Sequence, residues 1–227
     1  MNFLVNKLIR KTIINSLEEY GKVYYADKIR EISDSVAFHP DMQMHFVSEN
    51  TAFCEPTLYE YYKAVLPDYI KLMSGKTTLK AVYPLNCAYN IAKIGNYVIC
   101  NTKYADKTIL KYYEENNFNI VHINQGYAKC NISVIGKNKI ITEDRGIYKA
   151  IKDIPYIKTI LINHASVLLD GYDYGFIGGA TGCIDNKLLL CGKANEELKN
   201  ELTNNKIDYQ ELDNEKLEDF GSVLSFG

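Results

Sequence analysis

The stretch "CNISVIGKNKIITED", residues 130–144, decides the fold because the chain repeats it. Apolar residues alternate before Gly136, a Gly-Lys-Asn turn follows, and a β-branched run comes next, which is the pattern of a β-hairpin. A second copy, "YNIAKIGNYVICNT" at 89–102, matches the first at Asn90, Ile91, Ile94 and Gly95. The chain is therefore expected to be built from a recurring unit.

Two further copies extend the repeat in both directions. One is "FIGGATGCIDNKLLLCGK" at 176–193, and a weaker one is "PDMQMHFVSENTAFCEP" at 40–56. After each hairpin comes a segment with helical spacing, as in Ala105, Ile109 and Tyr113, and most copies then show a third apolar run, at 118–124, 156–163 and 207–212. The unit predicted from this order is ββαβ.

Each such unit has one apolar sheet face that it cannot bury alone, so a ring or stack with the helices outside is expected. We predict an α+β fold of about five ββαβ repeats in a single domain, 1–227. The repeats fall near 30–70, 89–124, 130–163 and 176–212, with a closing strand at 221–227 that "GKVYYADK" (21–28) completes. Residues before about 30 and the segment 64–80 fit the pattern poorly.

The amino-acid composition limits the kinds of binding partner and cofactor that are expected. Of 227 residues, 47% are apolar and 24% charged, and the net charge of −2 is spread without a basic run, so no nucleic acid is expected. No apolar stretch approaches the ~18 residues of a membrane span, and no membrane partner is expected. Six cysteines without a C-x-x-C pair favour free thiols in the cytoplasm. His122 and His164 lack metal-ligand spacing, so neither a metal nor another cofactor is predicted.

Two short motifs carry possible chemistry. "FHPDMQ" (38–43) contains His39-x-Asp41, and "QGYAKC" (125–130) leads through a glycine into Cys130. A ring of ββαβ units with such motifs resembles the pentein fold of the guanidine-modifying enzymes, which include arginine deiminases, agmatine deiminases and dimethylarginine hydrolases. The resemblance implies an α/β propeller around a pseudo-fivefold axis and a Cys that attacks an amidine or guanidine carbon.

The expected symmetry of the ring predicts where the candidate catalytic residues lie. Asp41 and Cys130 are both expected at the opening of the first strand of their hairpins, so in a ring of equivalent units they lie on the same rim together with His39. A thiol with a pKa of ~8.5 needs a neighbouring cation to become a thiolate. Protonated His39 would supply that cation and then act as acid and base, and Asp41 would orient it or bind the substrate. For Cys130, the competing interpretation is a small buried residue.

Cationic substrates need carboxylates. Candidate substrate-binding residues are Glu143, Asp144 and Asp173, with Asn131, Gly178 and Gly179 near the same rim. Two alternatives remain open. Glu143 and Asp144 precede a helix, where acids are favoured in any case, and the glycines of "GFIGGATG" also suit a close backbone approach or a bulge. The acids that flank the Gly-Gly pair in the deiminases are absent here, which puts arginine itself in doubt as substrate.

Two functions from different classes follow. One is a hydrolase, or an amidinotransferase, that acts on a non-peptide C–N bond of a small amidine or guanidine substrate. The other is a non-catalytic binding or scaffold protein with the same fold, because fold alone does not decide function. The sequence does not define the oligomeric state.

Overall fold

The computed structural model describes residues 1–163 and 165–227, whose strands form five three-stranded sheets. Four of them repeat one design, an antiparallel hairpin followed by a third strand parallel to the second. Their strands are β3 (Met44–Ser48), β4 (Thr51–Cys54) and β5 (Lys71–Ser74); β6 (Ala92–Ile94), β7 (Tyr97–Cys100) and β8 (Asn119–His122); β9 (Ile132–Ile135), β10 (Lys139–Thr142) and β11 (Lys158–Leu161); β12 (Thr181–Ile184), β13 (Lys187–Leu190) and β14 (Tyr209–Glu211). The α+β class is confirmed.

A helix joins the second and third strand of each unit, as the ββαβ pattern requires. These helices are α3 (Tyr59–Val65), preceded by the 3-10 turn η1 (Pro56–Leu58), α4 (Lys107–Glu115), α6 (Arg145–Ile151) and α7 (Glu196–Asn204). Side chains of Asp106, Asp144 and Asn195 accept hydrogen bonds from the first-turn backbone N–H groups of α4, α6 and α7. Each helix turns one apolar stripe inward, for example Leu198 and Leu202 of α7.

The two ends of the chain share the fifth sheet. Its middle strand is β1 (Asn2–Val5), which pairs antiparallel with β15 (Leu224–Phe226) and parallel with β2 (Lys22–Tyr25). Helix α1 (Lys11–Glu18) connects β1 to β2. Read from β15 through β1, this sheet has the same strand order as the other four, and the residues before 30 supply its middle strand.

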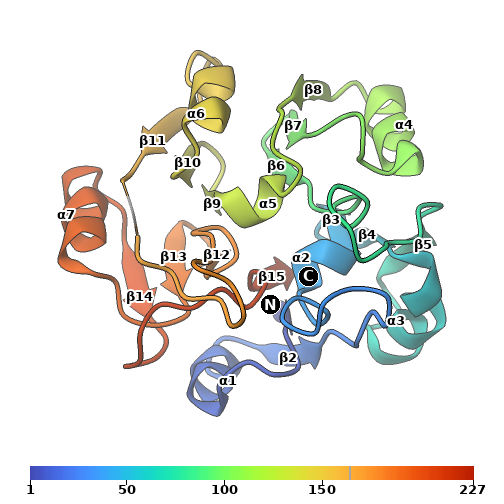
Figure 1. Ribbon diagram of the computed structural model, residues 1–227, viewed down its shortest axis with the longest axis horizontal. Coiled ribbons are helices and arrows are strands. Elements are labelled where there is room, and N and C mark those ends of the chain that lie inside the picture. Colours follow the sequence, from blue (N-terminus) through green and yellow to red (C-terminus); the bar gives the residue numbers. More distant parts are fainter. Residues whose placement is uncertain (164) are drawn as a thin grey trace.

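The five sheets surround the middle of the molecule, with α1, α3, α4, α6 and α7 on the outside (Figure 1). The first strands face inward and lie beside one another: β9 contacts β6 and β12, and β12 contacts β15. They nevertheless belong to separate sheets, so the hydrogen-bonded ladders do not close into one barrel within the part of the chain described. In that part, no helix is both long and apolar enough to cross a bilayer.

Short helical turns precede two of the inner strands, and this corrects the expected placement of Asp41 and Cys130. Both residues lie in these turns, α2 (Pro40–Gln43) and α5 (Ala128–Asn131), and not at the first strand position. Pro40 suits the first helical position because it has no N–H to leave unpaired. Since β3 begins at Met44 and β9 at Ile132, Met42 occupies the place of Cys130 in its own unit, and Asp41 occupies the place of Lys129.

Phe226 tests the contribution of the shared sheet to stability. Its ring is 2% exposed and stacks on Phe46, with ring centroids 4.8 Å apart. We expect Phe226→Ala to lower the free energy of unfolding by about 3 kcal/mol, because it removes buried aromatic contacts and leaves a cavity. Urea unfolding followed by circular dichroism measures this change.

Leu8→Ala is the matched control, because Leu8 is 65% exposed and its truncation should change stability by less than ~0.5 kcal/mol. Equal effects of the two substitutions would contradict a structural role for the C-terminal strand.

Candidate active site

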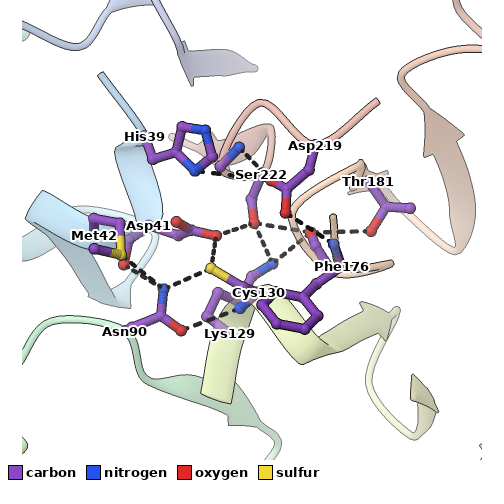
Figure 2. A network of polar contacts seen from close by, with 12 residues as sticks. His39, Asp41, Met42, Asn90, Lys129, Cys130, Phe176, Thr181, Asp219 and Ser222 are labelled. Carbon is purple, nitrogen blue, oxygen red and sulfur yellow. Dashed lines mark hydrogen bonds and ion pairs between the residues drawn. The ribbon is translucent and has the colours of Figure 1, made fainter. Parts of the chain in front are cut away.

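Cys130 is held in place by two neighbouring units. The side chain of Asn90 accepts a hydrogen bond from Cys130 N (3.1 Å) through Oδ1, and its Nδ2 donates to Cys130 Sγ (3.0 Å). On the other side, Gly179 N donates to Cys130 O (3.0 Å). Figure 2 shows the sulfur at the centre of this network. The thiol is therefore oriented by main-chain and side-chain contacts before any ligand binds.

Asp41 connects Cys130 to the C-terminal segment. The Cys130 thiol donates to Asp41 Oδ2 (3.2 Å), and the Ser222 hydroxyl donates to the same oxygen (2.7 Å). Lys129 Nζ donates in turn to Ser222 Oγ (2.9 Å), as seen in Figure 2. Asp41 is 1% exposed, and its other oxygen, Oδ1, has no hydrogen-bond partner among the described residues. Burial raises the pKa of this carboxyl, and nearby His39 opposes the rise.

His39 lies beside a second buried carboxylate, that of Asp219. Its Nδ1 is 3.8 Å from Asp219 Oδ1, while Phe176 N (3.0 Å) and Gly221 N (2.9 Å) donate to the Asp219 carboxylate. Burial lowers the pKa of His39 to about 4 and raises that of Asp219 to about 6. The imidazole is therefore neutral at pH 7. Gly221 has a φ of +76°, and a Cβ there would collide with the His39 side chain, so only glycine suits this approach.

A cavity of about 240 Å³ brings the thiol and the imidazole together. Cys130 and His39 both line it, with Asp173 and Asp219 as the acidic groups. The remaining wall is apolar or aromatic and consists of Val36, Met42, Tyr127, Leu169, Tyr172, Tyr174 and Phe176. Asp41 stays behind the wall, in contact with the sulfur. Of the predicted residues, Cys130, His39 and Asp173 therefore share one cavity and Asp41 supports it.

The remaining polar and glycine candidates on the predicted rim have packing roles. Asn131 Nδ2 donates to Tyr127 O (2.9 Å) and closes the turn of α5. Gly178 and Gly179 lie against backbone and carboxylate: a Cβ on Gly178 would collide with Lys129 O, and one on Gly179 with the Asp219 carboxylate. This is the close backbone approach that the glycine pair suggested, and neither glycine lines the cavity.

Glu143 and Asp144, the other two acids predicted to bind substrate, do not line this cavity. Asp144 caps α6 by accepting from Gly146 N (2.6 Å) and Ile147 N (2.8 Å), and Glu143 Oε1 accepts from Ala165 N (2.6 Å). The helix-start alternative holds for Asp144 because unpaired N–H groups of the first turn recruit its carboxylate.

Histidines elsewhere have other partners or are not described. His122 Nδ1 lies 2.8 Å from Thr102 Oγ1, and His45 Nε2 lies 2.7 Å from Tyr113 Oη, while His164 lies outside the described residues. Within residues 1–163 and 165–227, no cluster of three or more His, Cys, Asp or Glu side chains could hold a metal ion.

Four residues of the network were not found from the sequence: Asn90, Lys129, Asp219 and Ser222. Asn90 could have been found, since it matches Asn131 in the hairpin repeat and so lies one position from the place of Cys130. Lys129 could have been found once the turn before the strand was aligned with that of Asp41. Asp219 and Ser222 precede the last strand in "EDFGS", where the repeat signal is weakest.

The electrostatics differ from the expected ion pair. Burial raises the pKa of the Cys130 thiol well above its usual value, and the carboxylates of Asp41 and Asp219 raise it further. With His39 neutral, no imidazolium is present to lower it. At pH 7 the site without ligand therefore contains a neutral thiol and a neutral imidazole beside two carboxyl groups. A positively charged ligand would change the protonation equilibria of these groups most.

The fold belongs to a known class of structures. A dimethylarginine dimethylaminohydrolase adduct with S-methyl-L-thiocitrulline is 7% identical at a TM-score of 0.60, covering 95% of this chain and 92% of that one. An amidinotransferase of saxitoxin biosynthesis from Microseira wollei is 10% identical at 0.59, covering 89% and 73%. DDAH from Pseudomonas aeruginosa with citrulline is 6% identical at 0.57, covering 95% and 92%. The chain thus has the pentein-like fold that these structures share.

Sequence comparison assigns the family more narrowly. Residues 4–224 match the model described as "Family of unknown function (DUF6873)", so the chain belongs to that family. Among curated proteins, none matches the sequence.

The buried imidazole should make stability depend on pH. Its pKa is lowered from 6.5 to about 4 on folding, so below pH 6.5 the unfolded chain binds a proton that the folded chain does not. As pH falls from 6.5 to 4, the free energy of unfolding of the wild type should therefore drop by about 3 kcal/mol relative to His39→Gln. Parallel urea titrations at several pH values measure the difference.

Asp219→Asn should show the opposite sign and serves as the matched comparison. The pKa of Asp219 is raised on folding from 3.8 to about 6, so the wild type should lose stability relative to this variant as pH rises from 4 to 6. Parallel curves for the wild type and both variants would mean that neither group is buried as described.

Proposed function

We propose that this protein is a cofactor-independent cysteine hydrolase that cleaves a non-peptide C–N bond in a small amidine or guanidine cation. In this proposal the chain is one pentein-like domain, an α/β propeller of five ββαβ units around a pseudo-fivefold axis, and it works in the cytoplasm. The observation that carries the activity is one cavity lined by a thiol, an imidazole and two carboxyl groups. Six cysteines without a disulfide suit a reducing compartment.

Charge gives the cavity its preference for a cation. Its wall contains Asp173 and Asp219, it has no Lys or Arg among the described lining residues, and it includes four aromatic side chains. Carboxylates pair with a planar cation through charge-assisted hydrogen bonds, and aromatic faces attract cations. A flat amidinium fits such a site better than a neutral amide does.

The same charge would activate the nucleophile. A cation bound against Asp219 offsets the negative charge of the carboxylates that keep the Cys130 thiol protonated. The pKa of the Cys130 thiol therefore falls when the substrate binds. The thiolate then forms an S–C bond to the amidine carbon, the C–N bond breaks, and the thiol proton ends on the leaving amine. His39 is the nitrogen base on the cavity wall and carries that proton.

Water completes the cycle in the hydrolase. Neutral His39 takes a proton from a water molecule as its oxygen bonds to the carbon, the S–C bond breaks, and the proton returns to the sulfur. With an amine in place of water, the same steps would give amidino transfer.

A non-catalytic binding protein on the same fold is the second candidate. One observation favours it: Cys130 is only 4% exposed, and its resting thiol is neutral. In that case the cavity would bind a cation without forming a covalent bond. Ammonia release from a panel of guanidino and ureido compounds separates the two candidates.

Labelling of Cys130 tests the nucleophile. We expect 2-chloroacetamidine, a cationic electrophile, to modify Cys130 faster than any other cysteine at pH 7, and Cys130→Ala to abolish this labelling, because only this thiol lies in the acidic cavity. Mass spectrometry of tryptic peptides over time measures the rates. Cys191→Ala is the control, since Cys191 is buried with a pKa raised to about 12 and lies outside the cavity. Slow, uniform labelling of all six thiols would count against catalysis.

Asp173→Asn tests cation recognition. It should slow labelling by 2-chloroacetamidine about tenfold, the equivalent of about 1.4 kcal/mol, and leave labelling by neutral 2-chloroacetamide nearly unchanged. Asp185→Asn, outside this cavity, should affect neither probe. If Asp173→Asn slows both probes equally, the carboxylate has a structural role and does not select charge.

A further inference from the structure

A second, larger cavity lies on the other side of α5. Its volume is about 900 Å³, and the first strands of all five sheets contribute to its wall. None of the described residues lines both cavities. Neighbours in α5 separate them, because Cys130 faces the smaller cavity and Lys129 faces the larger one. The larger cavity has no role in the proposed reaction.

Three lysines line this central cavity: Lys93 from β6, Lys129 from α5 and Lys137 from the turn after β9. Within the described parts of the chain, none of them forms an ion pair within 4 Å. Lys129 Nζ donates only to neutral oxygens, those of Ser222 Oγ (2.9 Å) and Gly178 O (3.4 Å). Lys93 Nζ lies over the ring of Phe118, 5.5 Å from its centroid. None of these three ammonium groups therefore has a carboxylate within ion-pair distance among the described residues.

The other charged side chains of the wall are two acids, and the first and last residues of the chain, Met1 and Gly227, also line it. Glu49 follows β3 and Asp185 lies in the turn after β12, and both are exposed. Desolvation lowers the pKa values of Lys93 and Lys129, and it is opposed by Glu49 for Lys93 and by Asp41 for Lys129. Desolvation also lowers the pKa of His45 to about 3, and the charges of the two lysines lower it further. Their charges thus act on the same region between β3 and β6. Because the acids keep their water, the partly buried lysines dominate the inner wall.

We propose that the central cavity is a second binding site, for a small oxyanion held between Lys93 and Lys129. A carboxylate or phosphate oxygen would accept the hydrogen bonds that the two ammonium groups have to offer. The binding does not depend on the proposed catalysis.

The network in Figure 2 links this site to the thiol. Lys129 donates to Ser222, Ser222 donates to Asp41, and Asp41 accepts from Cys130, so three hydrogen bonds connect the two cavities. An anion on Lys129 places negative charge near this chain and draws the ammonium away from Ser222. Both effects disfavour the thiolate. Occupancy of the central cavity therefore slows reaction at Cys130. The biological meaning of this effect rests on the proposed function, but the effect itself can be measured without it.

Binding is tested with inorganic phosphate. Isothermal titration calorimetry at constant ionic strength, on the full chain, should show one site for the wild type, at least tenfold weaker binding for Lys93→Met, and severalfold tighter binding for Glu49→Gln. Lys111→Met is the matched control, because Lys111 is exposed on α4 and does not line the cavity. Circular dichroism checks that each variant is folded. Absence of binding, or equal loss in Lys93→Met and Lys111→Met, would overturn the site.

Coupling is tested separately through labelling of Cys130 by neutral 2-chloroacetamide. Saturating phosphate should slow labelling severalfold in the wild type and have little effect in Ser222→Ala, which breaks the link but keeps both lysines. Equal slowing in the two proteins would refute the hydrogen-bonded route, and no slowing in the wild type would refute coupling. A protein that binds phosphate but releases no ammonia from any guanidino compound would support the site while contradicting the proposed activity.

Discussion

The burial of the Asp41 carboxylate is the constraint on which the middle of the molecule depends. A carboxylate with 1% exposure is costly unless donors replace its water, and here the donors come from elements far apart in the chain. Cys130 belongs to α5, and Ser222 precedes β15, 181 residues after Asp41. One side chain therefore sets the relative positions of α2, α5 and the C-terminal segment. The apolar clusters each join at least two neighbouring units, and this polar contact fixes how three units meet at the centre.

Small residues make that meeting possible. Gly178 and Gly179 bring the segment before β12 against α5 and Asp219, and Gly221 brings the segment before β15 against His39. At each point a Cβ would overlap backbone or a fixed side chain, so the glycines are required by approach distance. The same approach removes water from His39, Asp219 and Cys130, and it is the cause of their shifted pKa values. Packing at the centre and the chemistry of the site are thus one arrangement.

The sequence predicts well what depends on local order. Hairpins such as "CNISVIGKNKII", the helices after them and the parallel third strands follow from alternation, turn residues and helical spacing, and the repeat suggested how distant units combine. The sequence predicts poorly the properties that depend on how deeply a side chain is buried. Protonated His39 was expected next to Cys130, but the imidazole is buried and neutral, and nothing in "FHPDMQ" reveals that burial. Asp41 was placed at a strand start because the four-residue turn α2 has too few residues to show a helical period.

Contacts between residues far apart in the chain also cannot be predicted from local sequence patterns. Asp219 and Ser222 resemble ordinary loop residues until the last strand pairs with the first, and only then do they face His39 and Asp41. In that arrangement, charged groups on two sides influence the ionisation of the Cys130 thiol. Asp219 shares the smaller cavity with it, where a cation favours the thiolate, and Lys129 reaches it through Ser222 and Asp41 from the central cavity, where an anion disfavours it. Opposite charges in the two cavities therefore act in opposite directions on one sulfur, through Asp219 on one side and Asp41 on the other.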